Sequence, residues 1–214
     1  MKKYLAEFIG TFALVFCGTG AVVVNSLSSN SLGLLGISAT FGIIITAMIY
    51  IFGSISGAHL NPAVTIGLSA GKKIQGKETV GYIISQILGA FFASRLLFLI
   101  FPETKTLGET MPNGGVFPAF ILELVLTFFL MLTILGITSK KEHSHLAGIV
   151  IGIVVTGIIL FAGPISGGSF NPARSIAPAL VSGNIMSLWI YIIAPILGSI
   201  LAMFIWLYFN IKEN

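Results

Sequence analysis

The sequence predicts an all-α transmembrane protein, with six spanning helices and two re-entrant half-helices in an inverted repeat of three spans each. Three observations lead to this class. The 214-residue chain is 56% hydrophobic and only 8% charged, whereas about 25% of the residues of a soluble domain are charged. Six apolar runs are long enough to cross the ~30 Å hydrocarbon core of a bilayer. A nine-residue motif also occurs twice, in corresponding halves of the chain.

The expected spans are continuous apolar runs separated by short polar stretches. No alternation of apolar and polar residues dominates. A chain in lipid must satisfy its backbone hydrogen bonds internally, so these runs are predicted to be helices. They cover approximately Tyr4–Val24, Leu34–Phe52, Thr79–Ile100, Phe117–Ile137, Leu146–Ala162 and Leu188–Tyr208.

The repeated motif is interpreted as a loop that ends in a helix start. Ser56–Val64 reads SGAHLNPAV, and 110 residues later Ser166–Arg174 reads SGGSFNPAR. Asparagine is a preferred N-cap, and proline is tolerated at the first helical position because its missing N–H would have no partner there. The helices that begin at Pro62 and Pro172 soon reach Gly-Lys-Lys and Ser-Gly-Asn. Both are therefore too short to span a membrane.

The lysines predict the orientation. In a six-span topology they fall almost entirely on one side, which the positive-inside rule assigns to the cytoplasm. We therefore expect a multi-pass protein of the cell (plasma or inner) membrane with both termini cytoplasmic. Confinement of the positive charges to short loops also argues against a nucleic-acid partner. The lysines on the majority side are Lys2, Lys3, Lys72, Lys73, Lys77, Lys140, Lys141 and Lys212; Lys105 falls on the other side.

The two halves resemble each other beyond the motif. Glu7 precedes Thr11 by four residues in the first span, and Glu123 precedes Thr127 by four in the fourth. We expect repeats at approximately residues 1–100 and 117–214 within a single channel domain, 1–214. Three spans per half is an odd number, so the second half is inverted and the half-helices enter from opposite faces.

This arrangement predicts a chemistry. A helix N-terminus carries a partial positive charge and unpaired N–H donors. Two N-termini that meet at mid-membrane repel cations, including the hydrated proton. A neutral solute can instead accept hydrogen bonds from the amides of Asn61 and Asn171, while carbonyls of the loops Gly53–Leu60 and Gly163–Phe170 line the path. The pattern predicts a narrow pore for small uncharged hydroxylic solutes.

Both Asn-Pro-Ala motifs are intact and Arg174 follows the second, so the whole chain resembles the aquaporin (major intrinsic protein) family. The resemblance implies a homotetramer in the lipid bilayer, with one pore in each subunit. It also implies a selectivity constriction, whose positions fall by spacing on Phe41, Ile159, Gly168 and Arg174. The resemblance implies Phe, His, a small polar residue or Cys, and Arg at these positions in water-selective members, and Trp, Gly, Phe and Arg in glycerol facilitators. Ile159 and Gly168 depart from both patterns and predict a wider aperture with one apolar wall.

The runs Gly163–Gly168 and Ile176–Leu180 look most like the nodulin-like branch of the family. That resemblance implies a passive channel for water and small uncharged solutes such as glycerol, urea and undissociated metalloid acids, for example arsenous acid. Other functions stay open at this point: a strict water channel, a proton-coupled secondary transporter of inverted-repeat type, and a structural membrane protein with a closed pore.

The remaining polar residues are weighed against these alternatives. A proton-coupled transporter would need intramembrane carboxylates such as Glu7 and Glu123, but their equivalence across the repeat favours a role in accepting N–H bonds from the loops. His59 is expected to line the inner vestibule, and Cys17 is expected to be a small core residue. The sequence shows no catalytic constellation, no metal-ligand spacing and no phosphate loop. It therefore predicts a protein that is not an enzyme and has no cofactor.

Overall fold

The structure is a computed structural model that describes residues 1–104 and 106–210. Lys105 and Lys212, which contributed to the expected orientation, lie outside these residues. The described chain is helical, without strands. Its long helices are α1 (Lys2–Leu27), α2 (Gly33–Ser56), α4 (Gly76–Ile100), α5 (Val116–Ser139), α7 (Ala147–Ser166) and α9 (Leu188–Phe209); its short helices are α3 (Pro62–Ala70), α6 (Lys141–Ser144) and α8 (Pro172–Ser182).

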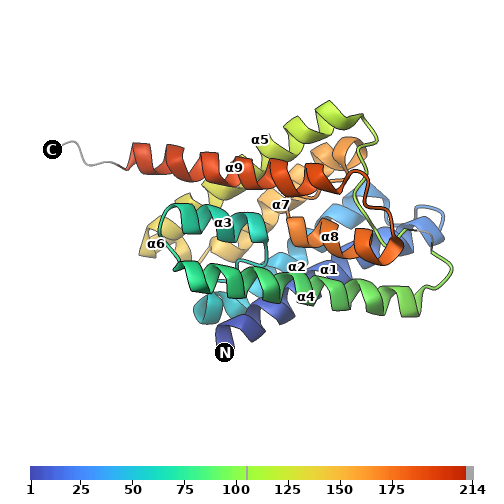
Figure 1. Cartoon of the computed structure of the whole chain (residues 1–214), viewed down its shortest axis with the longest axis horizontal. Coiled ribbons are helices and arrows are strands. Elements are labelled where there is room, and N and C mark those ends of the chain that lie inside the picture. The colour runs from blue at the N-terminus through green and yellow to red at the C-terminus, as the bar shows by residue number, and fades with distance from the viewer. Residues whose placement is uncertain (105, 211–214) are drawn as a thin grey trace.

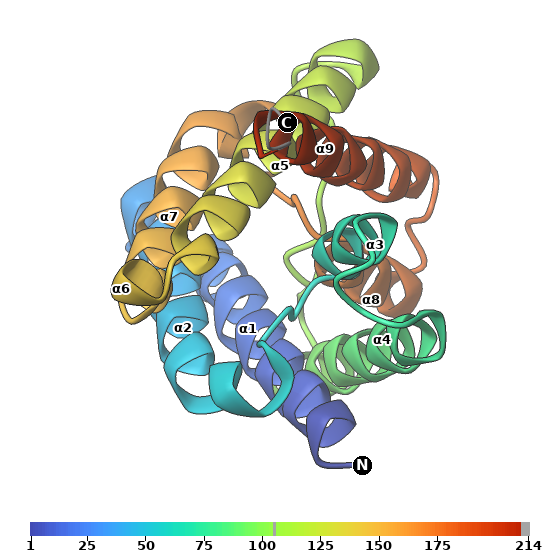
Figure 2. The same cartoon turned by 90° about the vertical axis from the view of Figure 1, so that its left-hand side faces the viewer.

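The long helices run along the longest axis of the molecule (Figure 1). The described residues contain six helices long and apolar enough to cross a membrane, which confirms the predicted spans. The start of α1, the end of α9, the α3–α4 turn and α6 lie at the same end of the bundle (Figure 1). We call this the basic end, because Lys2, Lys72 and Lys141 lie there, and we call the other the opposite end. Viewed from the basic end, α3 and α8 lie between α4 and α9 (Figure 2).

The loops that lead into the short helices are shorter than predicted. Residues 53–56 and 163–166 continue α2 and α7 and do not belong to the loops. Both α2 and α7 end at a glycine in the left-handed conformation, Gly57 with φ +85° and Gly167 with φ +83°. Glycine adopts this conformation without a Cβ clash and is the common helix terminator. The non-helical segments that can present carbonyls are therefore Gly57–Leu60 and Gly167–Phe170.

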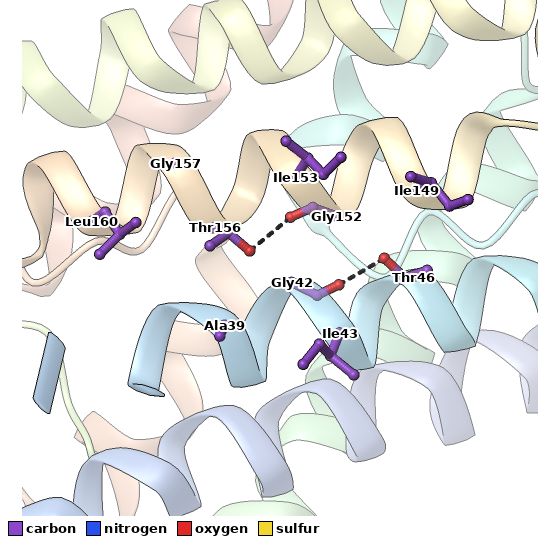
Figure 3. Close-up of a pocket in the computed structure, with 10 residues that line it drawn as sticks. All are labelled: Ala39, Gly42, Ile43, Thr46, Ile149, Gly152, Ile153, Thr156, Gly157 and Leu160. Atoms are coloured by element: carbon purple, nitrogen blue, oxygen red, sulfur yellow. Dashed lines mark hydrogen bonds between the residues drawn. The ribbon is translucent and has the colours of Figure 1, made fainter. Parts of the chain in front are cut away.

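A close crossing joins the two halves where α2 meets α7 (Figure 3). A Cβ on Gly42 would lie 2.6 Å from the carbonyl oxygen of Gly152, and a Cβ on Gly152 would lie 2.7 Å from that of Gly42. Thr46 donates to the carbonyls of Gly42 (2.8 Å) and Gly148 (3.0 Å), and Thr156 donates to Gly152 (3.0 Å). Small residues with bonded hydroxyls let the two backbones approach closely in lipid.

Cys17 is half-buried on α1 and is not the core residue that its apolar surroundings suggested. The buried stripe of this helix includes Leu14, Val15 and Gly18. Cys17 lies beside that stripe, next to the half-buried Phe16, because the helical repeat turns it away from the centre of the bundle.

Candidate functional site

The short helices begin at the prolines of the repeated motif. Asn61 caps α3 and accepts from the Ala63 N–H at 2.8 Å, and Asn171 caps α8 and accepts from the Ala173 N–H at 3.0 Å. Pro62 and Pro172 occupy the first helical position, where no backbone donor is needed. Each cap uses the Oδ1 atom of its asparagine and leaves the amide nitrogen free to donate elsewhere.

The amide nitrogens bind across the repeat. Asn61 Nδ2 donates to the Phe170 carbonyl at 2.8 Å, and Asn171 Nδ2 donates to the Leu60 carbonyl at 2.8 Å. Leu60 and Phe170 have φ of +52° and +53°, a conformation uncommon outside glycine that concentrates at functional sites. The N-termini of α3 and α8 thus meet at the centre of the bundle. Each amide keeps a second N–H.

Glu7 binds the first loop. This fully buried carboxylate accepts from the backbone N–H groups of His59 (2.9 Å) and Leu60 (2.8 Å), from the Ser56 hydroxyl (2.7 Å) and from Gln86 Nε2 (2.7 Å). Four donors on one carboxylate fix the loop path strongly, since charge-assisted hydrogen bonds are the stronger kind. Gln86 was not foreseen, although a glutamine inside an apolar span is a signal that could have drawn attention.

Glu123 binds the second loop in the same way. It accepts from the Ser166 hydroxyl (2.8 Å) and from the backbone N–H groups of Ser169 (2.9 Å) and Phe170 (2.6 Å). A tyrosine hydroxyl secures the start of each loop as well: Tyr82 donates to the Ser56 carbonyl and Tyr191 to the Ser166 carbonyl, both at 2.7 Å. The support of the two loops is therefore duplicated.

In the described part of the chain, cavities follow one another through the bundle. The basic-end cavity has a volume of about 290 Å³, the central cavity about 30 Å³, and the opposite-end cavity about 250 Å³. Asn61 lines both the basic-end and the central cavity, and Asn171 lines the central cavity. Neighbouring cavities share lining residues, so they lie in line along one candidate path with a narrow centre. The residues shared by the central and opposite-end cavities are Phe41, Ile159 and Arg174.

Arg174 stands at this shared wall. Its Nη1 donates to the Gly108 carbonyl at 2.6 Å, and its guanidinium carbon lies 5.4 Å from the centroid of the Phe41 ring. Within the described residues its buried Nε has no hydrogen-bond partner. Gly108 has φ +68°, and a Cβ there would lie 2.8 Å from the Thr19 carbonyl oxygen. Glycine is required at this contact, which the sequence alone did not reveal.

Gly168 is not on the described walls of either cavity, unlike the other residues of the expected constriction. It is buried with φ +60°, and a Cβ there would lie 3.5 Å from Ile159 Cα and Cγ1. The structure therefore brings Phe41, Ile159 and Arg174 together and places Gly168 beside Ile159. A side chain at Gly168 would contact Ile159, and the positive φ would strain the backbone of any residue other than glycine.

His59 lines the basic-end cavity, as do Lys73 and Thr138. Its Nδ1 lies 3.1 Å from the Thr65 hydroxyl, and its ring centroid lies 4.9 Å from that of Tyr82. Among the described residues no group of three or more His, Cys, Asp or Glu side chains is placed to hold a metal ion. What the site offers is hydrogen-bond donors and a fixed positive charge along a narrow path.

A further cavity, about 470 Å³, is the surface groove between α2 and α7 shown in Figure 3. It is rimmed by exposed Ile43 and Ile153, and its hydroxyls, Thr46 and Thr156, donate to carbonyls of the helices. Because ligand sites combine an apolar wall with a few free convergent polar groups, the path through the bundle is the better candidate site.

Facing half-helix N-termini on a path through a bundle of apolar spans define a channel-type membrane protein. Comparison with known proteins gives the family. The model of the major intrinsic protein family matches residues 1–206. Nodulin-26 of Glycine max is 38% identical over 202 residues, which cover 94% of this chain and 74% of that protein. The glycerol uptake facilitator protein-like 6 of Lactiplantibacillus plantarum is 42% identical over 212 residues, covering 95% and 96%.

The fold agrees with this assignment. The X-ray structure of the aquaglyceroporin from Plasmodium falciparum matches with a TM-score of 0.87 at 26% identity, over 96% of this chain and 94% of that one. The chain therefore belongs to the major intrinsic protein family of aquaporin-type channels, which are not enzymes. The predicted resemblance to the family and to its nodulin-like branch is confirmed.

Proposed function

We propose that residues 1–214 form a single channel domain that passes water and small uncharged solutes down their gradients and excludes ions and protons. The solute class is glycerol, urea and undissociated metalloid acids such as arsenous acid. The observation that carries the proposal is the path through the bundle, whose narrow centre is lined by Asn61 and Asn171. Each asparagine has an N–H available to a solute oxygen.

Exclusion of cations follows from the charges around the central cavity. The N-termini of α3 and α8 meet there, and each contributes a partial positive charge. Arg174 adds a full charge on the same wall. Glu7 and Glu123 are fully buried and already hydrogen-bonded to the loops, so they are not available to attract a cation into the path. We propose that they act as loop supports and not as proton carriers.

The apolar side chain of Ile159 favours the passage of solutes larger than water. It forms an apolar wall of both the central and the opposite-end cavity, where the carbon skeleton of glycerol can lie while its hydroxyls meet Arg174 and the asparagines. Glycerol uptake also appears in the name of the Lactiplantibacillus plantarum relative. We propose that Phe41, Ile159 and Arg174 line the selectivity constriction and that Gly168, which lies beside Ile159, belongs to it as well.

One observation favours a second candidate, the strict water channel. The central cavity of about 30 Å³ is large enough for a water molecule, which needs roughly 10–15 Å³ by this measure. Passage of glycerol would require the side chains at this point to move apart. Solute flux therefore decides between the two candidates.

Stopped-flow light scattering on proteoliposomes tests the proposal. We expect water, glycerol and urea permeabilities above those of bare lipid, with no change when a proton gradient is imposed. Water flux alone would establish the second candidate, and gradient-coupled uptake would establish a secondary transporter. No flux above bare lipid, or ionic current through the purified protein in a planar bilayer, would refute the channel proposal.

We further propose a homotetramer in the cell (plasma or inner) membrane, with one pore in each subunit and the basic end in the cytoplasm. Lys2, Lys72 and Lys141 at the basic end support the orientation through the positive-inside rule. His59 then lines the inner vestibule. The groove with Gly42 and Gly152 on the outer face of α2 and α7 supports close subunit contact. Native mass spectrometry tests the tetramer.

A further inference from the structure

Thr65 lies at the centre of a buried hydrogen-bond network in the first half. Its hydroxyl oxygen is 3.0 Å from the Asn61 carbonyl, 2.9 Å from Gln86 Nε2 and 3.1 Å from His59 Nδ1. Thr65 and Gln86 are fully buried, so solvent offers no alternative partners. The chemistry of the neighbours decides which of them donate and which accept.

The positions of the protons follow from these neighbours. The Thr65 hydroxyl donates its single proton to the Asn61 carbonyl one turn earlier in the helix, at 3.0 Å. Gln86 Nε2 can only donate; its other N–H bonds the Glu7 carboxylate at 2.7 Å, which fixes the orientation of the amide. The remaining contact of the Thr65 oxygen is a hydrogen bond only if His59 donates to it. The proton of the neutral imidazole therefore lies on Nδ1.

The other ring nitrogen of His59 is then an acceptor. In the described part of the chain Nε2 has no hydrogen-bond partner, and it is not among the buried unpartnered atoms. His59 lines the basic-end cavity, so this lone pair is open to the cavity. Other polar side chains on that wall include Lys73 and Asn61, whose nitrogens only donate.

We propose that Thr65 holds His59 in the Nδ1–H tautomer, so that Nε2 forms a fixed acceptor subsite for the hydroxyl or N–H groups of neutral solutes. Asn61 on the same wall donates and His59 accepts, so a hydroxyl can be bound in both of its hydrogen-bonding roles. The tautomer is a property of the folded chain; the solute subsite rests on the proposed function.

The second half supplies a matched control. Ser175 holds the place of Thr65, 110 residues on. Its hydroxyl lies 2.5 Å from the Ser169 hydroxyl and 2.8 Å from that of Thr110. No histidine is involved in these contacts. Loss of this hydroxyl removes a buried group of the same kind without touching the network around His59.

Nuclear magnetic resonance of ¹⁵N,¹³C-histidine-labelled protein in liposomes tests the tautomer. The sequence has three histidines, and exchange of the exposed His143 and His145 for Asn isolates the His59 signals. The pH should be about two units above the ordinary histidine pKa of ~6.5. We expect a protonated Nδ1 and an unprotonated Nε2. A protonated Nε2 in this otherwise native protein would overturn the proposal, whatever the variants show.

The variants then identify the positioning residues. Thr65→Ser should keep the Nδ1–H tautomer and Thr65→Val should lose it, since only serine retains the oxygen that His59 binds. Ser175→Ala should leave the His59 signals unchanged. A Thr65→Val spectrum like that of the native protein would show that Thr65 does not set the tautomer.

Glycerol permeability tests the subsite. Loss of one hydrogen bond to the solute should lower it about fivefold in Thr65→Val, with recovery in Thr65→Ser. A switched tautomer with unchanged glycerol permeability would refute the solute role but leave the channel function standing. If the native protein carries no glycerol, the proposed glycerol function and the solute role fail together, whereas the tautomer result is unaffected.

Discussion

The loops that lead into α3 and α8 have the same internal support but present different side chains. In both halves a buried glutamate binds the loop N–H groups and an asparagine binds the opposite loop. Three residues after the asparagine stands Val64 in the first half and Arg174 in the second; two residues before it stand His59 and Ser169. The duplicated residues build the frame, and the residues that differ give the two ends of the path different chemistry.

The frame itself is slightly unequal. Gln86 lies four residues after Tyr82, and Pro195 lies four residues after Tyr191. Gln86 donates to Glu7, whereas a proline side chain has no donor. The first carboxylate is therefore bound by one more donor than the second. Gln86, on α4, also donates to Thr65 on the first half-helix, α3, and Pro195 cannot make the corresponding bond in the second half.

The largest effect should come from removing the carboxylates. Glu7→Ala and Glu123→Ala leave several buried donors without partners, at about 1–3 kcal/mol each. We expect both to lower the unfolding free energy by several kcal/mol, Glu7→Ala by somewhat more because Gln86 is also left unpaired. Thermal unfolding in detergent, followed by tryptophan fluorescence, measures this. Glu142→Ala, on the exposed α6, is the control, and equal melting of all three variants would contradict the assigned support.

Next in size is Arg174→Val, which makes the second half match the first at this position. It removes the charge from the central cavity together with the contacts to Gly108 and Phe41. We expect glycerol permeability to rise roughly tenfold, equivalent to ~1.4 kcal/mol, and proton leakage to become measurable with a pH-sensitive dye in the liposomes. Arg95→Leu removes an exposed arginine on α4 and should change neither quantity. Unaltered selectivity in Arg174→Val would mean that this arginine is not part of the constriction.

A smaller effect is expected for Ile159→His. The imidazole replaces the apolar wall shared by the central and opposite-end cavities, so glycerol permeability should fall a few-fold while water permeability remains measurable. Ile49→His makes the same change at the equivalent position of the first half, which lines the wide basic-end cavity. It should have little effect on glycerol, and an equal loss in both variants would argue against a special role for Ile159.

The smallest effect concerns mercury. Cys17 does not line the described cavities of the path, so mercurials should leave water permeability unchanged in the native protein and in Cys17→Ser. Ile159→Cys should become sensitive, because the new thiol stands at the constriction. Strong inhibition that disappears in Cys17→Ser would place this cysteine on the path after all.

The spans and the helix starts could be predicted because they depend on composition and on local capping. Helix ends were less accurate. The sequence suggested loops from Gly53 and Gly163, but these glycines are helical, and α2 and α7 continue to Ser56 and Ser166, next to the first glycine that takes a left-handed turn. Gly57 and Gly167 would have been the better stop signals.

The site was predictable where the repeat duplicated it and, for Phe41, Ile159 and Arg174, where spacing located the cavity wall. The equivalence of Glu7 and Glu123 suggested contacts with the loops, and those hydrogen bonds are present, although their functional role is still a proposal. Gln86 and Gly108 were missed because their partners lie far along the chain, at a separation of 79 residues for Glu7 and 66 for Arg174. Spacing located Gly168 along the chain but could not tell whether it lines the cavity.

The reciprocal hydrogen bonds of Asn61 and Asn171 have a mechanical consequence. A protein that pumps by rocking one half against the other must open a gap between them at the substrate site. Here such a movement would break both carbonyl contacts at once, in a region where no bulk water replaces them. The two loops should therefore keep their relative position while solutes move through the path, so the net direction of the solutes is set by concentration alone.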